Sequence, residues 1–338
     1  MSLHQKFLII QTAFIGDVIL ATPIIENLKN NYPNSEIHFC LRKGNESLFH
    51  DHPYLAKIII WDKSSKYKNL FSLIKSIRKE QYDHVFCVQR FFSAGLITWL
   101  SGAKQKTGFN KSPFSRFFNS KIEHNIGNGS HETERNTALV SKICSNTSNQ
   151  PKLYLNDEVR QNITDYISPY YICIAPASVW FTKQFPADKW TELLNAIAVE
   201  HPHAKTYIVG APSDKTIANN IIQKSNNKQL VSLCGRLSLL ESAALMSHAK
   251  MNFVNDSAPM HLASAVDAPV CAIYCSTIPS FGFGPLSKDS HIVQIAANSA
   301  EQLNCRPCGL HGHQACPKQH FKCAHDIDIQ HLLQTLPI

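Results

Sequence analysis

The chain has 338 residues, of which 44% are hydrophobic and 17% are charged, a composition typical of a water-soluble globular protein. No uninterrupted apolar run approaches the ~18 residues that a membrane-spanning helix needs, and the first residues contain no apolar secretory segment with a cleavage site. We therefore expect a cytoplasmic protein whose eleven cysteines are mostly reduced.

The formal net charge of +8 is unevenly distributed. Residues 1–155 contain 20 Lys and Arg against 11 Asp and Glu, whereas residues 156–338 contain 13 against 14. The basic excess, which includes Lys63, Lys66 and Lys68, indicates either a solvated surface or a half that meets an anionic partner. Nucleic acid, an acidic membrane face and a phosphorylated glycan are all compatible with it.

In chain order, the first half alternates short apolar runs with helical periodicity. Strands are predicted at 7–10, 36–41, 57–61 and 84–88, and helices at 18–30, 70–78 and 132–143. Such a βαβ series builds a parallel sheet with helices on both faces. Residues 102–129, which are basic, aromatic and rich in Asn and Ser, predict a surface loop with short helical turns. Residues 145–151 predict a linker that bends or is cleaved.

The second half repeats the alternation, with strands predicted at 171–175, 206–209, 230–233, 251–254 and 270–274. The chain is too long for one usual core, so the two arrays predict two Rossmann-like α/β domains, residues 1–150 and residues 151–338. Ligands of open α/β sheets bind outside the carboxyl ends of the strands. Those ends lead into the loops 11–17, 175–184, 210–214 and 255–261.

Residues 255–265 follow an apolar strand and open a helix of small residues. Asp256 or Ser257 is expected at the N-cap, and Pro259 lies in the first turn, where a missing N–H costs little. A helix start with a hydroxyl and no bulky side chain is suited to binding an anion. An ordinary capped helix is the alternative, and capping alone favours it.

The carboxyl-terminal region is dense in thiol and imidazole groups. Its cysteines are spaced Cys305-x2-Cys308-x7-Cys316-x6-Cys323, interleaved with histidines. In a reducing compartment such a cluster favours a metal site over disulfides, although a single Cys-x2-Cys is only part of a zinc ribbon. A structural zinc and reduced or partly disulfide-bonded cysteines both remain open.

Several segments together resemble glycosyltransferase family 9, the ADP-heptose:lipopolysaccharide heptosyltransferases. They are Gly16-Asp17 followed by Thr22-Pro23, Pro176 through Lys183 into Phe185-Pro186, Gly210-Ala211-Pro212, and Asn255-Asp256-Ser257-x-Pro-Met-His. They occur in the family's order and cover nearly the whole chain. The resemblance implies a GT-B type α/β fold, in which two Rossmann-like domains face each other across a cleft. It also implies an acceptor-binding domain at 1–150, a nucleotide-sugar-binding domain with a Cys-rich tail at 151–338, and inverting transfer that requires no cofactor.

The resemblance also implies roles for individual residues. Asp17 is implied to be the base that takes a proton from the acceptor hydroxyl, with Thr12 and Gly16 beside it on the acceptor side. A helix N-cap is the competing role for Asp17. Lys183 is implied to neutralise the leaving diphosphate, whereas without the resemblance it reads as an exposed loop lysine.

The remaining implied contacts concern the donor. The amides and hydroxyl of Asp256, Ser257 and Ala258 would hold phosphate oxygens, in a family that usually has glycine where this chain has Ala258. The other implied donor residues flank these on neighbouring loops: Ser178, Thr182, Asp214 near the ribose, Leu237 at the adenine, and His261. Core packing is the competing role for Leu237 and His261. A similar cysteine tail in the family suggests that Cys305, Cys308, Cys316 and Cys323 form a structural staple.

Two functions of different classes follow. The first is a heptosyltransferase at the inner membrane face, with ADP-heptose as donor, a lipid-linked core oligosaccharide as acceptor, peripheral contact with anionic lipid and no nucleic-acid partner. The second is a non-catalytic nucleic-acid-binding protein with a Cys/His zinc module. A dinucleotide dehydrogenase is disfavoured because no Gly-x-Gly-x-x-Gly follows the first strand.

Overall fold

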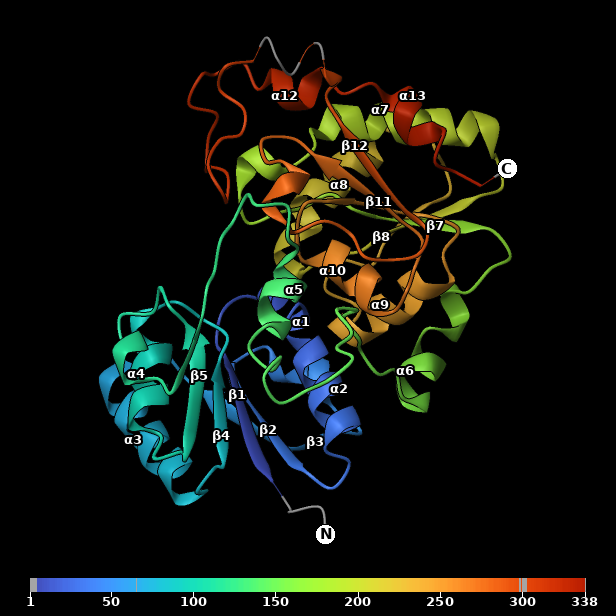
Figure 1. Cartoon of the computed structure of the whole chain (residues 1–338). Helices are drawn as coiled ribbons and strands as arrows, with labels where there is room; N and C mark the ends of the chain where they lie inside the picture. The colour runs from blue at the N-terminus through green and yellow to red at the C-terminus, as the bar shows by residue number, and fades with distance from the viewer. Residues whose placement is uncertain (1–4, 65, 298, 300–302, 338) are drawn as a thin grey trace. The chain divides into compact units, whose positions relative to one another are not determined.

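The computed structural model describes residues 5–64, 66–297, 299 and 303–337, and it divides into two compact units. Unit 1 is Met1–Tyr154 and unit 2 is Leu155–Ile338, so the division lies four residues beyond the expected position. Within the described residues, each unit contains one six-stranded sheet in which all neighbouring strands are parallel (Figure 1). No helix in this part of the chain has the length and apolar character needed to cross a bilayer.

The sheet of unit 1 has the strand order β3-β2-β1-β4-β5-β6. Its strands are β1 (Lys6–Gln11), β2 (Glu36–Arg42), β3 (Leu55–Trp61), β4 (His84–Cys87), β5 (Gln105–Phe109) and β6 (Ser120–Ile122). Its helices are α1 (Ile15–Ile19), α2 (Thr22–Asn31), α3 (Lys66–Lys79), α4 (Phe92–Leu100) and α5 (Glu132–Thr137), with 3-10 turns η1 (Glu46–Phe49) and η2 (Ser115–Phe117). The central strand β1 forms from an apolar run, residues 7–10, whose side chains are fully buried.

Unit 2 has the order β12-β11-β10-β7-β8-β9. Its strands are β7 (Tyr171–Ala175), β8 (Lys205–Ile208), β9 (Leu230–Ser232), β10 (Asn252–Asn255), β11 (Val270–Tyr274) and β12 (Ser290–Gln294). Its helices are α6 (Asp157–Asn162), α7 (Ala187–Glu200), α8 (Lys215–Lys224), α9 (Leu239–His248), α10 (Ala258–Ala265), α12 (Lys322–His325) and α13 (Ile329–Leu333). Its 3-10 turns are η3 (Thr164–Tyr166), η4 (Phe181–Lys183), η5 (Pro212–Asp214) and η6 (Pro279–Phe281).

Two helices predicted for unit 1 are wrong in detail. The helix predicted at 18–30 is broken into α1 and α2, because the ring of Pro23 excludes the carbonyl of Ile19 four residues earlier. The Thr22 hydroxyl donates to that carbonyl instead, at 2.7 Å. The helix predicted at 132–143 is helical only as far as Thr137 and continues as turns.

The predicted loop at 102–129 contains two strands, β5 and the edge strand β6. Their short, partly basic sequences hide the strand pattern, and Gly108 is needed in β5 because an added Cβ would lie 2.5 Å from the Phe118 ring. The predicted linker at 145–151 is pinned to α2. The Ser148 amide donates to Asn27 at 2.8 Å, and the Ser145 amide donates to Asn31 at 2.9 Å.

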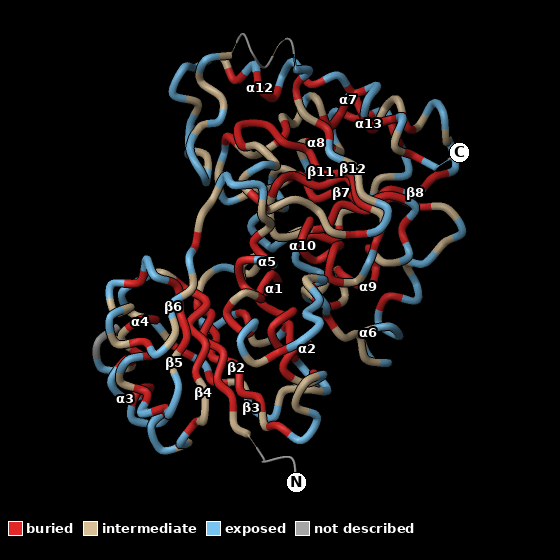
Figure 2. The backbone as a smooth tube through the Cα atoms, viewed as in Figure 1, coloured by how far each residue is buried: buried red, intermediate tan, exposed pale blue. Residues whose placement is uncertain are grey.

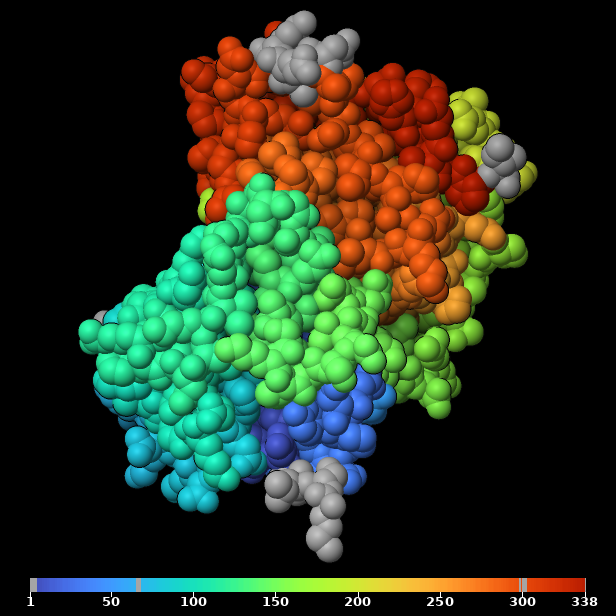
Figure 3. All heavy atoms as spheres, in the orientation of Figure 1, coloured from blue at the N-terminus to red at the C-terminus, as the bar shows by residue number. Residues whose placement is uncertain are grey.

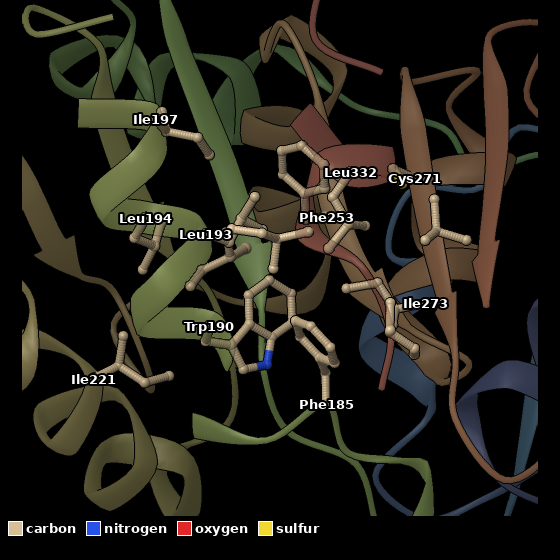
Figure 4. Close-up of a cluster of buried hydrophobic side chains, with 14 of the residues drawn as sticks. Phe185, Trp190, Leu193, Leu194, Ile197, Ile221, Phe253, Cys271, Ile273 and Leu332 are labelled. Atoms are coloured by element: carbon tan, nitrogen blue, oxygen red, sulfur yellow. The ribbon is translucent and has the colours of Figure 1, made fainter. Parts of the chain in front are cut away.

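The central strands of both sheets are buried along most of their length (Figure 2). One core cluster of unit 2 lies between the sheet and α7, where Trp190 meets the ring of Phe185 edge-on at 5.3 Å (Figure 4). Phe253 of β10 and Leu332 of α13 belong to the same cluster. Since Phe185 ends the loop that follows β7, this packing anchors that loop to the core.

Candidate active site

The loop that follows β1 is held by the ends of three neighbouring strands. The hydroxyl and the amide of Thr12 both donate to Gln89, at 2.7 and 3.2 Å. Asn45, beyond β2, donates to the carbonyl of Ala13 at 3.0 Å, and the Lys63 ammonium, beyond β3, donates to the carbonyl of Thr12 at 2.8 Å. The loop is therefore fixed in place before any ligand arrives.

Lys63 differs from the free surface lysine that the charge distribution suggests. Its ammonium lies 4.6 Å from the centre of the Trp61 ring while it bonds Thr12. Neither Gln89, Asn45 nor Lys63 belongs to the expected site. A polar residue two or three positions after the end of β4, β2 and β3 is the signal that could have found them.

Asp17 lies in the third position of α1, and Phe14, not Asp17, is at the N-cap position. The carboxyl is half-buried, and burial first, then the negative charge of Glu132, raises its pKa to about 6. Backbone hydrogen bonds at Phe14 and Asp17 and the charge of Arg90 act in the opposite direction. Gly16 precedes Asp17 in the same helix. A carboxylate with this pKa is mostly ionised at pH 7 yet accepts a proton more readily than an ordinary aspartate does.

Glu132, whose negative charge is the second cause of the raised pKa of Asp17, was not among the residues predicted from the sequence. Glu132 begins α5 and is buried, with its carboxylate 2.7 Å from Arg135 and 3.3 Å from His124. Although burial alone would raise the pKa of Glu132, hydrogen bonds and charge from His124 and Arg135 hold it below its ordinary value. Glu132 therefore stays ionised beside Asp17.

Helix α5 is hydrogen-bonded to the segment that carries Asp17. The side chain of Asn136 donates to the carbonyl of Leu20, directly after α1, at 3.0 Å. Every residue of α5 is polar, and most of them are buried. A helix without an apolar residue can be buried only if its polar groups pair internally, and that is the signal that could have identified it.

In unit 2, Lys183 and Asp256 are brought together from the ends of two adjacent strands. Lys183 lies in η4, after β7, and its ammonium is 2.7 Å from Oδ2 of Asp256, after β10. The two side chains are 14% and 8% exposed, so Lys183 is not an exposed loop lysine. Thr277 donates to the same oxygen of Asp256 at 2.6 Å, which leaves one aspartate oxygen serving two donors.

Asn255, the last residue of β10, fixes the loop that carries Lys183. Its side-chain amide donates to the carbonyl of Pro176 at 2.8 Å, and its oxygen accepts from the amide of Phe185 at 2.9 Å. The residue is fully buried. Because these bonds close both ends of the loop, Asn255 holds the segment that carries Lys183.

At the helix start formed by residues 256–258, the Ser257 hydroxyl and the Asp256 amide are bonded differently from the expectation. Ser257 is at the N-cap position, but its hydroxyl donates to the carbonyl of Asn255 at 3.4 Å rather than capping the helix. The amide of Asp256 donates to Ile273 at 3.2 Å, so it is not available to a phosphate. The available backbone donors of this turn are therefore Ser257 and Ala258. His261 lies one turn into α10 and is buried.

Two residues expected to bind the donor are engaged in hydrogen bonds within unit 2. Thr182 is buried, and its hydroxyl oxygen accepts from Ser276 at 3.0 Å and from the amide of His313 at 2.8 Å. The half-buried Ser178 accepts from the side chain of Gln184 through its carbonyl, at 2.6 Å. In this structure, the hydrogen bonds of Thr182 therefore fix η4 to Ser276 and His313.

The remaining two expected donor residues lie near β8 and β9. Both carboxylate oxygens of Asp214 accept bonds from its own turn, from the amide of Ala211 at 2.8 Å and the hydroxyl of Ser213 at 3.0 Å. Leu237 is half-buried and packs against a core cluster of unit 2. Each oxygen of Asp214 retains a second lone pair that can accept a ligand hydroxyl.

The four carboxyl-terminal cysteines converge on one cavity of about 250 Å³, which His313 and His320 also line. All four thiols are free, and the sulfur of Cys305 is 3.7 Å from Nε2 of His320. Burial raises the pKa of Cys323 to about 12, whereas backbone hydrogen bonds at Phe321 and its neighbours outweigh burial and lower the pKa of Cys316.

The donor set of this cavity fits a tetrahedral zinc, although its sulfurs are not drawn together. In the described ranges, three potential ligand atoms lie within 4.8 Å of one another only at Glu36, His38 and Glu80. That group already surrounds the ammonium of Lys6, which pairs with Glu36 at 3.2 Å. A metal at the cysteines would therefore have to pull the four sulfurs inward.

The Cys-rich segment is bonded to the elements that carry Lys183. Arg306 donates to the carbonyls of Cys275 and Thr277, both at 2.8 Å, and the amide of Cys308 donates to Ser276 at 2.8 Å. The backbone of His313 exchanges bonds with Thr182, next to Lys183. A metal or any other interaction that fixes the Cys-rich segment would therefore also fix η4.

Comparison with known proteins identifies the family. The family model described as "Glycosyltransferase family 9 (heptosyltransferase)" matches residues 70–310, more than two thirds of the chain. The chain belongs to glycosyltransferase family 9. It is an enzyme, and the resemblance seen in its motifs is confirmed, so the reading as a non-catalytic nucleic-acid-binding protein is wrong.

Individual relatives are similar over most of their length. Lipopolysaccharide heptosyltransferase 3 of Escherichia coli is 26% identical over 282 residues, which cover 78% of this chain and 82% of that protein. The structure of E. coli ADP-heptose LPS heptosyltransferase II matches with a TM-score of 0.80 at 20% identity, covering 98% and 97% of the two chains. E. coli heptosyltransferase WaaC with ADP-2-deoxy-2-fluoro heptose matches with a TM-score of 0.70 at 20% identity, covering 88% and 98%. The GT-B type of fold, with two Rossmann-like units, is thereby confirmed for this family 9 chain.

Proposed function

We propose that this family 9 enzyme moves a heptose from ADP-heptose to a hydroxyl of the lipopolysaccharide inner core, with inversion and without a catalytic metal. The named relatives are lipopolysaccharide heptosyltransferases, and one similar structure holds an ADP-heptose analogue. The observation that carries the proposal is the ion pair of Lys183 with Asp256, which places a nearly buried ammonium beside the amino end of α10. A nucleoside diphosphate is the leaving group that such a site stabilises.

In this mechanism the ionised carboxylate of Asp17 takes the proton of the acceptor hydroxyl. The acceptor oxygen attacks the anomeric carbon, the bond from that carbon to the diphosphate breaks, and ADP leaves with the electron pair. Attack from the face opposite the leaving group inverts the configuration. Thr12 and Gly16, which flank Asp17, would lie on the acceptor side.

Lys183 supplies the positive charge that the departing diphosphate needs. Its ammonium has three donors, so it can bind a phosphate oxygen while it keeps Asp256 as a partner. The amides of Ser257 and Ala258 and the positive end of α10 add to this charge. His261, Thr182 and Ser178 complete the phosphate side of the proposal, and Asp214 and Leu237 complete the nucleoside side.

The proposal assigns unit 1 to the acceptor and unit 2 to the donor. It also places the enzyme in the cytoplasm, peripheral to the inner membrane face, because its acceptor is lipid-linked. The basic excess of residues 1–155 supports this assignment, since core oligosaccharide and inner-leaflet lipid are both anionic.

We further propose that Cys305, Cys308, Cys316 and Cys323 hold one structural zinc ion. Four cysteine side chains that line one shared cavity support this assignment, and they would bind the metal as thiolates. When bound, the metal would crosslink the Cys-rich segment and take no part in transfer. The segment's own residues act on the site, because His313 holds Thr182 and Arg306 holds the end of β11.

A nucleotide-release assay tests the proposed function. The purified enzyme is incubated with ADP-, UDP- and GDP-sugars and with delipidated core oligosaccharide acceptors. Release of ADP from ADP-heptose, dependent on acceptor, is expected, with an inverted anomeric configuration in the product. Equal release from UDP- or GDP-sugars, or release that ignores the acceptor, would refute the proposed donor or the proposed acceptor.

A further inference from the structure

Helix α4 of unit 1 is apolar on its exposed side as well as its buried side. Its nine residues, Phe92–Leu100, include no charged residue. Phe92 is 60% exposed and Trp99 37% exposed, and Leu96 and Leu100 on the same side are half-buried. A surface helix of a water-soluble protein ordinarily carries charge on its outer face, so this helix lacks the feature that would suit it to water.

Aromatic rings from two elements join on this helix into a continuous surface. We define the aromatic ridge as Phe92, Trp99, Phe114 and Phe117. The ring centre of Trp99 lies 4.2 Å from that of Phe117 and 5.6 Å from that of Phe114, stacked in both cases. Phe92 meets Phe114 edge-on at 5.0 Å. Contiguous exposed apolar patches of this kind mark interaction sites.

The sequence segment that forms the aromatic ridge is basic and contains no acidic residue. Residues 84–122 include six Lys or Arg and no Asp or Glu, and the neighbouring α3 includes five and none. The guanidinium of Arg116 lies 4.7 Å from the centre of the Phe117 ring, so one charge is part of the ridge itself. Figure 1 shows α3 and α4 side by side, and Figure 3 shows the atoms of this stretch in teal at the surface of unit 1.

This combination favours a lipid surface over other occupants. A second copy of the chain, placed on the same patch by two-fold symmetry, would oppose the basic residues of the ridge with the same residues. Single-stranded nucleic acid binds by stacking bases on open ring faces, but Trp99 already stacks with Phe114 and with Phe117, so these rings are engaged with one another. Partly exposed aromatic side chains among basic residues suit the headgroup level of an anionic bilayer.

We propose that the aromatic ridge is a membrane-docking surface, which inserts its rings among the headgroups of an anionic bilayer while Arg116, Lys111 and Lys121 contact lipid phosphates. The inference rests on the proposed function for its purpose, since a lipid-linked acceptor is presented at such a surface. It assigns membrane contact to one defined patch of unit 1 rather than to the whole basic half.

Sedimentation with vesicles tests the docking surface. The full-length enzyme is mixed with vesicles of phosphatidylethanolamine and phosphatidylglycerol at 7:3, or of phosphatidylcholine alone. Each basic side chain near an anionic bilayer contributes about fivefold to binding, so Lys111→Glu with Arg116→Glu should lower binding to the anionic vesicles by more than tenfold. Raised salt should shrink the difference. Lys224→Glu with Lys228→Glu, an exposed pair in unit 2, is the matched control and should bind as the wild type does.

Tryptophan quenching supplies a second readout that does not depend on charge. Brominated lipid in the anionic vesicles should quench part of the fluorescence, and Trp99→Phe should abolish that part. The other tryptophans are Trp61 and Trp190, which are buried, and the half-buried Trp180 of unit 2. Val199→Ser, at an 82% exposed apolar position in unit 2, is the control for loss of an exposed apolar side chain.

The outcomes separate the docking surface from the proposed function. Unchanged vesicle binding by the charge variant, or unchanged quenching in Trp99→Phe, would overturn the inference. A ridge-dependent dimer, or duplex or single-stranded RNA binding without vesicle binding, would overturn it as well. The charge variant should transfer normally to a delipidated acceptor. If the wild type binds vesicles through the ridge but transfers to no core acceptor, the docking surface stands and the proposed function fails.

Discussion

The raised pKa of Asp17 leads to a prediction for the pH dependence of transfer. The structure raises that pKa from 3.8 to about 6, first by burial and then by the charge of Glu132. A general base must be ionised, so the acid limb of kcat/KM should lie near pH 6. At pH 5 about a tenth of the plateau activity should remain, whereas a base with the ordinary pKa would keep more than 90%.

Glu132→Gln removes the second cause of the shift and leaves burial in place. The acid limb should therefore move to lower pH, to a value between 3.8 and about 6, and activity at pH 5 relative to the plateau should rise several-fold. Loss of the Glu132 charge also removes the carboxylate that offsets the positive charge of Arg135, and that charge stabilises a nearby carboxylate in the same direction. Glu123→Gln, an exposed residue of unit 1 with the same change of charge, should leave the limb in place.

The assay is nucleotide release at subsaturating substrate between pH 4.5 and pH 8.5, with each variant's fold checked by thermal unfolding. Asp17→Asn should reduce transfer by ~100-fold or more at every pH while donor binding is retained. Because the folded-state pKa is raised, the ionised carboxyl destabilises the folded protein above about pH 6 and not below about pH 4. Asp17→Asn should therefore melt a few degrees higher than the wild type at pH 7.5, and the gap should close as the pH falls through that window. Near-normal turnover in Asp17→Asn, or an acid limb that stays in place in Glu132→Gln, would refute the reasoning.

Three further predictions concern unit 2. Lys183→Ala should weaken donor binding by ~10- to 100-fold and slow transfer, because a charge-assisted bond is lost and Asp256 keeps only Thr277 as a donor. Equal donor affinity in this variant and in the control Lys189→Ala would contradict the role of Lys183. Asn255→Ala should raise the donor KM with little change in acceptor KM, since the loop 176–185 loses its two hydrogen bonds to the Asn255 side chain. An unchanged donor KM would show that packing alone holds the loop. Elemental analysis should find close to one zinc per chain. Cys308→Ser with Cys316→Ser should lose the metal, lower the melting temperature and weaken donor binding through Thr182, whereas the control Cys234→Ser should keep the metal. A wild-type protein that is free of metal after gentle purification would contradict the zinc site and show that the cysteines are reduced thiols.

Much of the fold and part of the site could be predicted from the order of residues alone. Apolar runs such as residues 7–10 and 171–175 can be satisfied only as buried parallel strands, so the two sheets and the loops at their carboxyl ends follow from local pattern. Gly16-Asp17 and residues 255–261 were located by motif, because their chemistry is carried by residues adjacent in sequence. The break between α1 and α2 was predictable too, since Pro23 acts on a carbonyl four residues away.

Only the tertiary structure decided which distant groups act on these residues. Lys183 lies 73 positions from Asp256 in the chain, yet their atoms are 2.7 Å apart because β7 and β10 are neighbours in the sheet. Glu132 raises the pKa of Asp17 from a helix whose polar sequence predicts exposure, and its burial depends on Arg135 and His124 pairing with it. Trp99, Phe114 and Phe117 form one ridge because α4 and η2 pack together, and no local pattern predicts that contact. Coulombic and stacking interactions depend on distance in space, and for these residues that distance is set by strand order and helix packing rather than by position in the chain.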